Sequence, residues 1–319
     1  MAQTVLIIGI TGGIGLAFAK ACQKKGWQIR ALHRNPAAAK RRLSALPDID
    51  WISGDGMARQ DVLKAAEGVD VIFHAANPPG YAKWRELALP MLENAIAAAL
   101  AGNARLAFPG NVYNFGPDAR PLVNETSPQH PTTRKGQVRV EMEGLLKAAA
   151  KKGAKILIVR AGDFFGADAP SSWFHQIMAK PGKKVVSTVY PGRHEAGHSW
   201  AYLPDLAETF VQLLERESDL ASFDVFHFGG QYFPRGGEMA VKILEVAGVP
   251  DGKIGKAPWL VIRLLSPFVT LFREMIEMRY LWQEDLRLDN GKLVAFLGRE
   301  PHTPVEQALR DSLTEMKCL

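Results

Sequence analysis

The sequence has few of the features that cross-link a protein or anchor it in a membrane. It contains 2 cysteines among 319 residues, Cys22 and Cys318, which excludes a disulfide framework and predicts a reducing, cytoplasmic compartment. No apolar run is long enough to cross a bilayer, and the N-terminus does not resemble a signal peptide. We therefore expect no membrane partner.

An excess of one charge is also largely missing. The chain has 39 Lys and Arg against 33 Asp and Glu, a formal net charge of +6, and its basic residues are scattered. This balance argues against a nucleic-acid partner and fits an anionic small molecule better. Hydrophobic residues make up 47% of the chain, which is typical of a globular protein.

What the first half of the chain does contain is a regular alternation of short apolar runs and longer amphipathic stretches. Strands are predicted at 5–8, 28–32, 49–52, 69–73, 105–108 and 156–159, with helices between them. Strands separated by helices need crossover connections, which predict an α/β fold with a Rossmann-type doubly wound parallel sheet. After about residue 166 strands and helices mix, which indicates a smaller C-terminal α+β lobe.

A glycine-rich turn follows the first predicted strand and opens the first predicted helix. Gly9, Gly12 and Gly15 have the spacing Gly-x-x-Gly-x-x-Gly, which permits a tight turn and a close approach of the backbone to a pyrophosphate. In this context the motif predicts dinucleotide binding, and the alternative is a tight turn without a ligand. We place an NAD(P)-binding domain at 1–166 and a substrate-binding lobe at 167–319, and leave open that the chain crosses back.

The end of the second predicted strand indicates which dinucleotide is bound. An acidic residue there would bind the ribose 2′-hydroxyl of NAD, but this chain has His33 and Arg34. A guanidinium suits a 2′-phosphate, so NADP is predicted. If Arg34 is only a solvated turn residue, NAD is the alternative.

These residues resemble the extended short-chain dehydrogenases/reductases, the NAD(P)-dependent epimerase/dehydratase superfamily. The likeness covers about residues 5–230 and rests on motifs in the family's order: the glycine turn, Gly54-Asp55, His74-Ala75-Ala76, Asn111-Val112-Tyr113, Val159 to Gly166 and Trp200 to Ala207. The resemblance implies a small-molecule substrate, commonly a nucleotide sugar, and a homodimer through the helices after the fourth and fifth strands. It implies a cofactor site formed by Gly9, Thr11, Gly12, Gly13, Ile14, Gly15, His33, Arg34, Asp55, Ala75, Ala76, Asn77 and Lys135.

The chain departs from this family at the catalytic residues. The family uses a Ser or Thr after the fifth strand and a Tyr-x-x-x-Lys pair, but this sequence has Pro109 or Gly110 at the first position and Lys135 and Arg139 at the pair. Either Lys135 or Tyr113 can then serve as the proton donor, while Arg139, which keeps its proton, binds the ribose or a substrate anion.

Two functions follow from these departures. The first is an NADP-dependent oxidoreductase or epimerase that transfers hydride to or from a carbonyl or carbinol carbon. The alternative is a catalytically silent NAD(P)-binding sensor or regulator, in which Lys135, Arg139 and Glu143 form a solvated stripe at helical spacing.

Four further segments give local predictions. His194 and His198 have a zinc-protease spacing, but Gly197 interrupts a helix there, so no metal is expected and contact of either histidine with an anion remains open. Residues 260–278 are predicted as one helix. The overlapping apolar stretch 259–272 is expected to be buried and to cover a substrate pocket, with membrane contact as the alternative. Thr132 or Thr133 is predicted to cap a helix, and Asp205 to cap the helix from Leu206.

Overall fold

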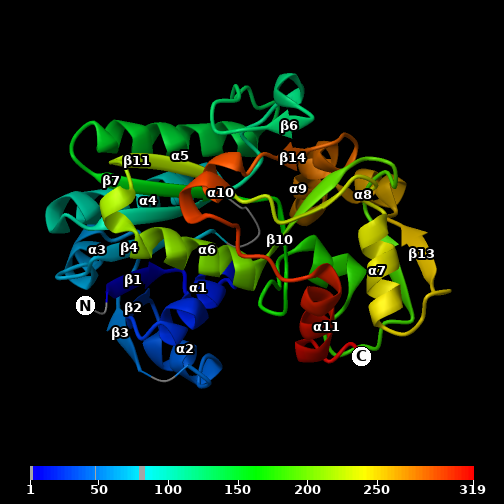
Figure 1. The fold of residues 1–319 in the computed structure, drawn as a ribbon, viewed down its shortest axis with the longest axis horizontal. Helices are drawn as coiled ribbons and strands as arrows, with labels where there is room; N and C mark the ends of the chain where they lie inside the picture. The colour runs from blue at the N-terminus through cyan, green and yellow to red at the C-terminus, as the bar shows by residue number, and fades with distance from the viewer. Residues whose placement is uncertain (1–2, 47, 79–82) are drawn as a thin grey trace.

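A seven-stranded parallel sheet forms the centre of the computed structural model, which describes residues 3–46, 48–78 and 83–319 (Figure 1). Its strand order is β11-β7-β5-β4-β1-β2-β3, and all neighbouring strands pair in parallel. The strands are β1 Thr4–Ile8, β2 Gln28–His33, β3 Ile49–Ser53, β4 Val71–His74, β5 Arg105–Gly110, β7 Lys155–Arg160 and β11 Phe223–His227. This order is that of a doubly wound Rossmann sheet, so the predicted fold class is confirmed.

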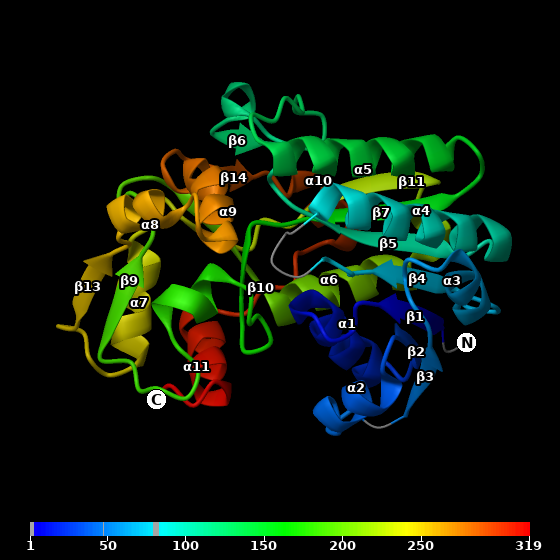
Figure 2. The ribbon, with the colours of Figure 1, turned by 180° about the vertical axis from the view of Figure 1, so that it is seen from behind.

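Helices cover both faces of the sheet because its strands are apolar on both sides. In β1, Val5 and Ile7 face one layer, whereas Leu6 and Ile8 face the other. The first layer contains α1 Gly13–Lys24, α6 Leu203–Glu215 and α10 Gly291–Leu297; the second contains α3 Arg59–Ala65, α4 Trp84–Gly102 and α5 Arg134–Ala150 (Figures 1 and 2). The short helix α2 Pro36–Arg42 follows β2.

The C-terminal lobe is built from small sheets and short helices. One sheet has the order β12-β10-β8, and two strand pairs, β13 with β9 and β14 with β6, complete the strands. Their bounds are β6 Leu122–Val123, β8 Asp163–Phe165, β9 Ser187–Tyr190, β10 His198–Tyr202, β12 Gln231–Phe233, β13 Lys253–Lys256 and β14 Arg287–Leu288. The helices are α7 Glu238–Val246, α8 Trp259–Leu265, α9 Thr270–Met278 and α11 Val305–Glu315, with single turns at Pro117–Ala119, Phe174–Met178, Glu217–Asp219 and Arg279–Trp282.

The chain crosses back from the lobe to the large sheet. Strand β11 hydrogen-bonds to β7, with Phe223 opposite Ile156 and His227 opposite Arg160. Helix α6 packs against α1. The seventh strand of the sheet therefore comes from beyond residue 166.

Three local predictions have clear outcomes. Thr133 caps α5, because its hydroxyl accepts a hydrogen bond from Gly136 N at 3.0 Å. The cap predicted at Asp205 is wrong: α6 begins at Leu203, and the carboxylate instead accepts two 2.7 Å hydrogen bonds from Thr303. The single helix predicted over 260–278 is also wrong, because it divides into α8 and α9 around Pro267, which cannot supply a helical N–H group.

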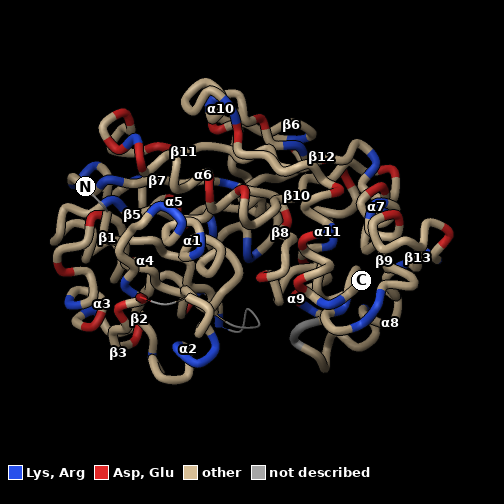
Figure 3. Tube along the Cα trace, turned by 60° about the horizontal axis from the view of Figure 1, so that its bottom comes forward, with Lys and Arg blue, Asp and Glu red and all other residues tan. Residues whose placement is uncertain are grey.

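The expected burial of residues 259–272 is wrong for most of their apolar side chains. Ile262 is buried, but Leu260, Leu264 and Phe268 are 73%, 66% and 85% exposed. Figure 3 shows Lys and Arg interspersed with Asp and Glu over much of the chain, in keeping with the scattered basic residues of the sequence. Within the described ranges, no helix has the length and apolar character needed to cross a bilayer.

Candidate active site

The glycine turn joins β1 to α1 at the carboxyl edge of the sheet. Gly9 has a φ of +97°, and a Cβ there would lie 2.6 Å from Ala76 N. A Cβ on Gly15 would collide with the carbonyl oxygen of Gly9. Only glycine fits these two positions, which keeps the turn tight. The N-cap is the exposed Gly12, which has no side chain to satisfy the first N–H groups of α1, so these groups suit a pyrophosphate.

The predicted cofactor residues on β2 and β3 lie at the same edge of the sheet. His33 ends β2, and its Nδ1 accepts a hydrogen bond from Asn35 N at 3.0 Å. Arg34 follows with an exposed side chain. Asp55 lies just after β3, where its carboxylate accepts a hydrogen bond from Met57 N at 3.0 Å. The structure therefore brings these residues to the edge that the glycine turn occupies.

The end of β4 supports the glycine turn. Ala75 N donates to Ile8 O at 2.9 Å, and the backbone of Ala75 and Ala76 packs against Gly9. Asn77 accepts a 2.6 Å hydrogen bond from the indole N–H of Trp84 on α4. Close packing of backbone on backbone explains why small residues follow β4.

His74, the last residue of β4, is a buried histidine at this edge. Its ring lies parallel to that of Phe108, with centroids 6.2 Å apart, and neither ring nitrogen has a hydrogen-bond partner within the described part of the chain. Burial and the nearby charge of Arg139 lower the pKa of His74 to about 4. The imidazole is therefore neutral at physiological pH.

Lys135 lies in the first turn of α5, and α9 packs over it. Its Nζ is 2.7 Å from Oε2 of Glu274 and donates to the Glu274 carbonyl at 3.0 Å. Its backbone N–H donates to Oε1 of Glu277 at 2.9 Å. Lys135 and Glu143 are 4% and 7% exposed, so the solvated stripe is wrong. The two α9 carboxylates lie outside the recognisable motifs, so their contact with Lys135 was not predicted from the sequence.

Arg139 lies one turn further along α5, on the side that faces β5. Its Nη1 donates to Pro109 O at 3.3 Å, and its guanidinium carbon lies 5.3 Å from the ring centroids of Trp84 and Phe108. The residue at the position of the family's lysine therefore holds its positive charge at the carboxyl end of β5.

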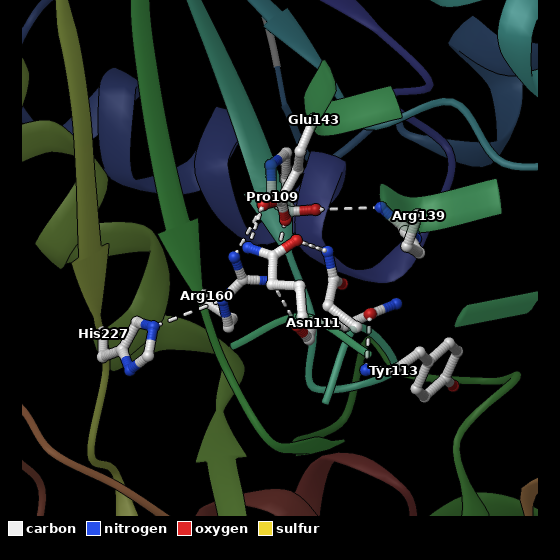
Figure 4. A network of polar contacts seen from close by, with 9 residues as sticks. Pro109, Asn111, Tyr113, Arg139, Glu143, Arg160 and His227 are labelled. Atoms are coloured by element: carbon white, nitrogen blue, oxygen red, sulfur yellow. Dashed lines mark hydrogen bonds and ion pairs between the residues drawn. The ribbon is translucent and has the colours of Figure 1, made fainter. Parts of the chain in front are cut away.

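Tyr113 lies in the turn after β5, directly against the start of α5. Its backbone N–H donates to Oδ1 of Asn111 at 3.0 Å, and its ring points away from the polar network drawn in Figure 4. A Cβ on Gly136 would collide with the Tyr113 carbonyl oxygen, so α5 approaches this turn at a glycine. Arg139 and Tyr113 thus lie at the end of β5, whereas Lys135 lies beside the Tyr113 turn with its ammonium group directed to α9.

A buried ion pair supports this turn from behind. Arg160 on β7 contacts both carboxylate oxygens of Glu143 on α5, at 2.7 and 2.8 Å, and donates to Asn111 O at 2.8 Å (Figure 4). Gln129 donates to the same carboxylate at 3.0 Å. Such a two-pronged pair fixes geometry as well as charge. Its role was not predicted, although an arginine directly after an apolar strand was the available signal.

His227 on β11 completes the network. Arg160 Nε donates to its Nε2 at 3.3 Å, and its Nδ1 lies 3.2 Å from Val123 O. Burial, with a contribution from Arg160, lowers the pKa of His227 to about 3. A neutral imidazole can accept at Nε2 and donate at Nδ1, so it satisfies both contacts.

The lobe contains a cavity of about 280 Å³ whose charged lining residues are mostly basic, and we call it the basic cavity. Arg193, Lys256 and Arg279 line it together with one acidic residue, Glu195. The Arg279 guanidinium carbon lies 5.0 Å from the ring centroid of Trp259, another lining residue. This combination of cations and an aromatic ring suits an anionic ligand.

The two histidines with zinc-protease spacing have different surroundings. His194 lines the basic cavity, so its contact with an anion stays a prediction. His198 begins β10, where its Nε2 lies 2.9 Å from Asp163 and its ring stacks on Trp282 at 4.0 Å. Across the described ranges, no three His, Cys, Asp or Glu side chains gather as metal ligands.

The sheet order and the uncapped glycine turn define a dinucleotide-binding protein of the Rossmann class. Residues 5–229 match the NAD dependent epimerase/dehydratase family, and the chain belongs to this family of enzymes.

Solved structures with the same fold agree with this assignment. The UDP-glucose 4-epimerase of Bifidobacterium longum, in complex with NAD+ and UDP, is 16% identical with a TM-score of 0.77, over 99% of this chain and 98% of that one. The UDP-glucuronic acid 4-epimerase of Bacillus cereus, in complex with NAD, is 15% identical with a TM-score of 0.75, over 99% of each chain.

A curated relative gives less information about activity. The uncharacterized protein y4nG of Sinorhizobium fredii (strain NBRC 101917 / NGR234) is 24% identical over 174 residues, which are 51% of this chain. The match spans 42% of that relative's own length.

Proposed function

We propose that this protein is an NADP(H)-dependent oxidoreductase or epimerase that acts on a carbonyl or carbinol carbon of an anionic small molecule. The observation that carries the proposal is the uncapped glycine turn, which shares one edge of the sheet with the exposed Arg34. Arg34 would hold the 2′-phosphate of the cofactor, and the N–H groups of α1 its pyrophosphate. When bound, the nicotinamide supplies or accepts a hydride.

We assign the donation of a proton to the substrate to a residue near the end of β5. Tyr113 is the proposed proton donor, because the ammonium group of Lys135 is held by the Glu274 carboxylate. Arg139 cannot give up its proton and therefore binds the cofactor ribose or a substrate oxygen. The buried pair of Glu143 and Arg160 keeps the Tyr113 turn in place.

A nucleotide sugar is the proposed substrate class. Support comes from the basic cavity of the lobe and from the structural neighbours that bind UDP and NAD. We also propose a homodimer through α4 and α5, as the family resemblance implies. The two buried cysteines are not joined in a disulfide, which fits a reducing compartment such as the cytoplasm.

The ion pair between Lys135 and Glu274 also supports the second candidate, a catalytically silent NAD(P)-binding regulator. Calorimetric titration with NADPH and NADH, followed by hydride-transfer assays with ketones, aldehydes and nucleotide sugars, separates the two. Turnover that is lost in Tyr113→Phe, with NADPH affinity unchanged, supports the enzyme. Tight NADPH binding without turnover favours the regulator, and no affinity for either coenzyme contradicts both.

A further inference from the structure

The segment from α8 to the start of α9 presents a concentrated apolar surface. Six large hydrophobic side chains exposed in the described structure lie within ten residues of one another, and we call them the α8 patch: Leu260, Val261, Leu264, Leu265, Phe268 and Val269. Phe268, at 85% exposure, follows Pro267 in the connection between the two helices. A patch of this kind on a water-soluble surface marks a contact site.

The α8 patch is exposed although its helix is firmly attached to the lobe. Trp259 donates its indole N–H to Pro191 O at 2.8 Å, and Ile262 is buried beneath the helix. At the other end, Glu274 and Glu277 of α9 bind Lys135. The apolar side chains therefore point outward from a fixed support.

The segment that carries the patch is rich in basic residues and poor in acidic ones. Residues 252–273 contain no Asp or Glu, and their basic residues all have exposed side chains: Lys253, Lys256, Arg263 and Arg273. The exposed Asp251 directly precedes this range, and Glu195 shares a cavity with Trp259 and Lys256. The acidic residues that follow the range, Glu274 and Glu277, face Lys135 and Arg134, with side chains only 13% and 12% exposed. The outer surface of this segment is therefore apolar and cationic.

We infer that the α8 patch docks this protein on the surface of a bilayer that contains anionic lipids. Exposed Leu and Phe side chains with basic neighbours are the composition of segments that lie in the membrane interface. Figures 1 and 2 show α8 in the C-terminal lobe beside β13, away from α4 and from the large sheet. A short helix with a projecting Phe268 is also a small surface for a stable protein–protein interface.

This contact is peripheral, and the inference does not rest on the proposed function, although Trp259 and Lys256 also line the basic cavity of the lobe. It departs from the expectation of no membrane partner and takes up the membrane contact that was the alternative for residues 259–272. The sequence alone could not separate a buried helix from an interfacial one, because both are rich in Leu, Ile and Val.

Vesicle flotation with the full chain tests the inference. We expect binding to vesicles of 70% phosphatidylcholine and 30% phosphatidylglycerol, and about tenfold weaker binding to phosphatidylcholine alone. The double variant Leu264→Glu/Phe268→Glu is expected to lose at least about tenfold in partitioning to the anionic vesicles. Val241→Glu, at an exposed apolar position of α7, is the matched control and should bind like the wild type.

Three outcomes would overturn the inference. They are equal binding to both vesicle types, unchanged binding of the double variant, and no binding by the wild type. Sedimentation velocity without vesicles tests whether a second copy of the chain covers the patch. If the wild type does not bind vesicles and sediments as a dimer while the double variant sediments as a monomer, the patch is a self-association surface. Circular dichroism confirms that each variant is folded.

Discussion

The ammonium group of Lys135 and the carboxylate of Glu274 lie 2.7 Å apart, although the residues are 139 positions apart in the chain. The first belongs to the helix that carries the family's catalytic pair, and the second to a helix of the C-terminal lobe. The lobe therefore supplies a charged partner to the position where the family has its tyrosine. A change in α9 can consequently alter the candidate active site without touching the Rossmann sheet.

The substitution Glu274→Gln should destabilise the protein strongly. It removes the carboxylate partner of a buried ammonium group, so we expect the free energy of unfolding to fall by about 3 kcal/mol in urea denaturation. Glu141→Gln is the matched control, because Glu141 on α5 pairs with Arg85 at an exposed site and should change stability by less than about 1 kcal/mol. Equal losses in both variants would contradict the special role of the buried pair.

Gly9→Ala should abolish dinucleotide binding and lower stability. The residue has a φ of +97°, and its Cβ would lie 2.6 Å from Ala76 N and 2.7 Å from the Ala75 carbonyl carbon. Moving the backbone on both sides is costly, so we expect the free energy of unfolding to fall by at least about 2 kcal/mol. Gly144→Ala is the control, since a Cβ within α5 meets open space there and should stabilise by up to about 1 kcal/mol. Thermal unfolding and NADPH titration measure both effects.

Arg34→Ser should change coenzyme preference and leave stability unaltered. The exposed guanidinium is the proposed partner of the 2′-phosphate, so NADPH affinity should fall by about 10- to 100-fold while NADH affinity stays the same. Arg42→Ser, an exposed change on α2, should affect neither coenzyme. If both coenzymes bind Arg34→Ser and the wild type equally well, the NADP assignment is wrong.

Stability should fall as the solution is acidified below about pH 6.5. His74 and His227 have folded pKa values of about 4 and about 3, below the ordinary 6.5. Between these values the unfolded chain binds protons that the folded protein does not, so lowering the pH favours unfolding. Each histidine should lower the free energy of unfolding by up to about 3 kcal/mol between pH 7 and pH 4. Urea denaturation from pH 7 to pH 4 measures this loss, and His74→Phe should flatten the profile; an unchanged profile would contradict the assignment.

The sheet and the glycine turn were predictable because each depends on residues that are close in the sequence. The run from Val5 to Ile8 and the glycines after it specify a strand, a turn and a helix without help from distant contacts. The same local logic placed the cap of α5 at Thr132 or Thr133, and the structure has it at Thr133. Local sequence patterns therefore predict most of the strands and helices of the Rossmann half.

The surroundings of the candidate site depend on contacts between distant segments. Lys135 and Glu143 have the spacing of a solvated helix face, yet α9 and β7 bring Glu274 and Arg160 to them. Asp205 resembles a helix cap in sequence, but Thr303 takes its carboxylate. Such partners follow from tertiary packing, which overrides local preference.

The pairing of β11 with β7 has a consequence for dissecting this chain. A fragment that ends at residue 166 would stop the large sheet at β7 and leave a bare row of N–H and C=O groups along that edge. Such fragments tend to recruit strands from other copies and aggregate. The cofactor half should therefore not be expressible as a stand-alone module, and a chimera that exchanges the lobe must keep 223–227 with its parent sheet.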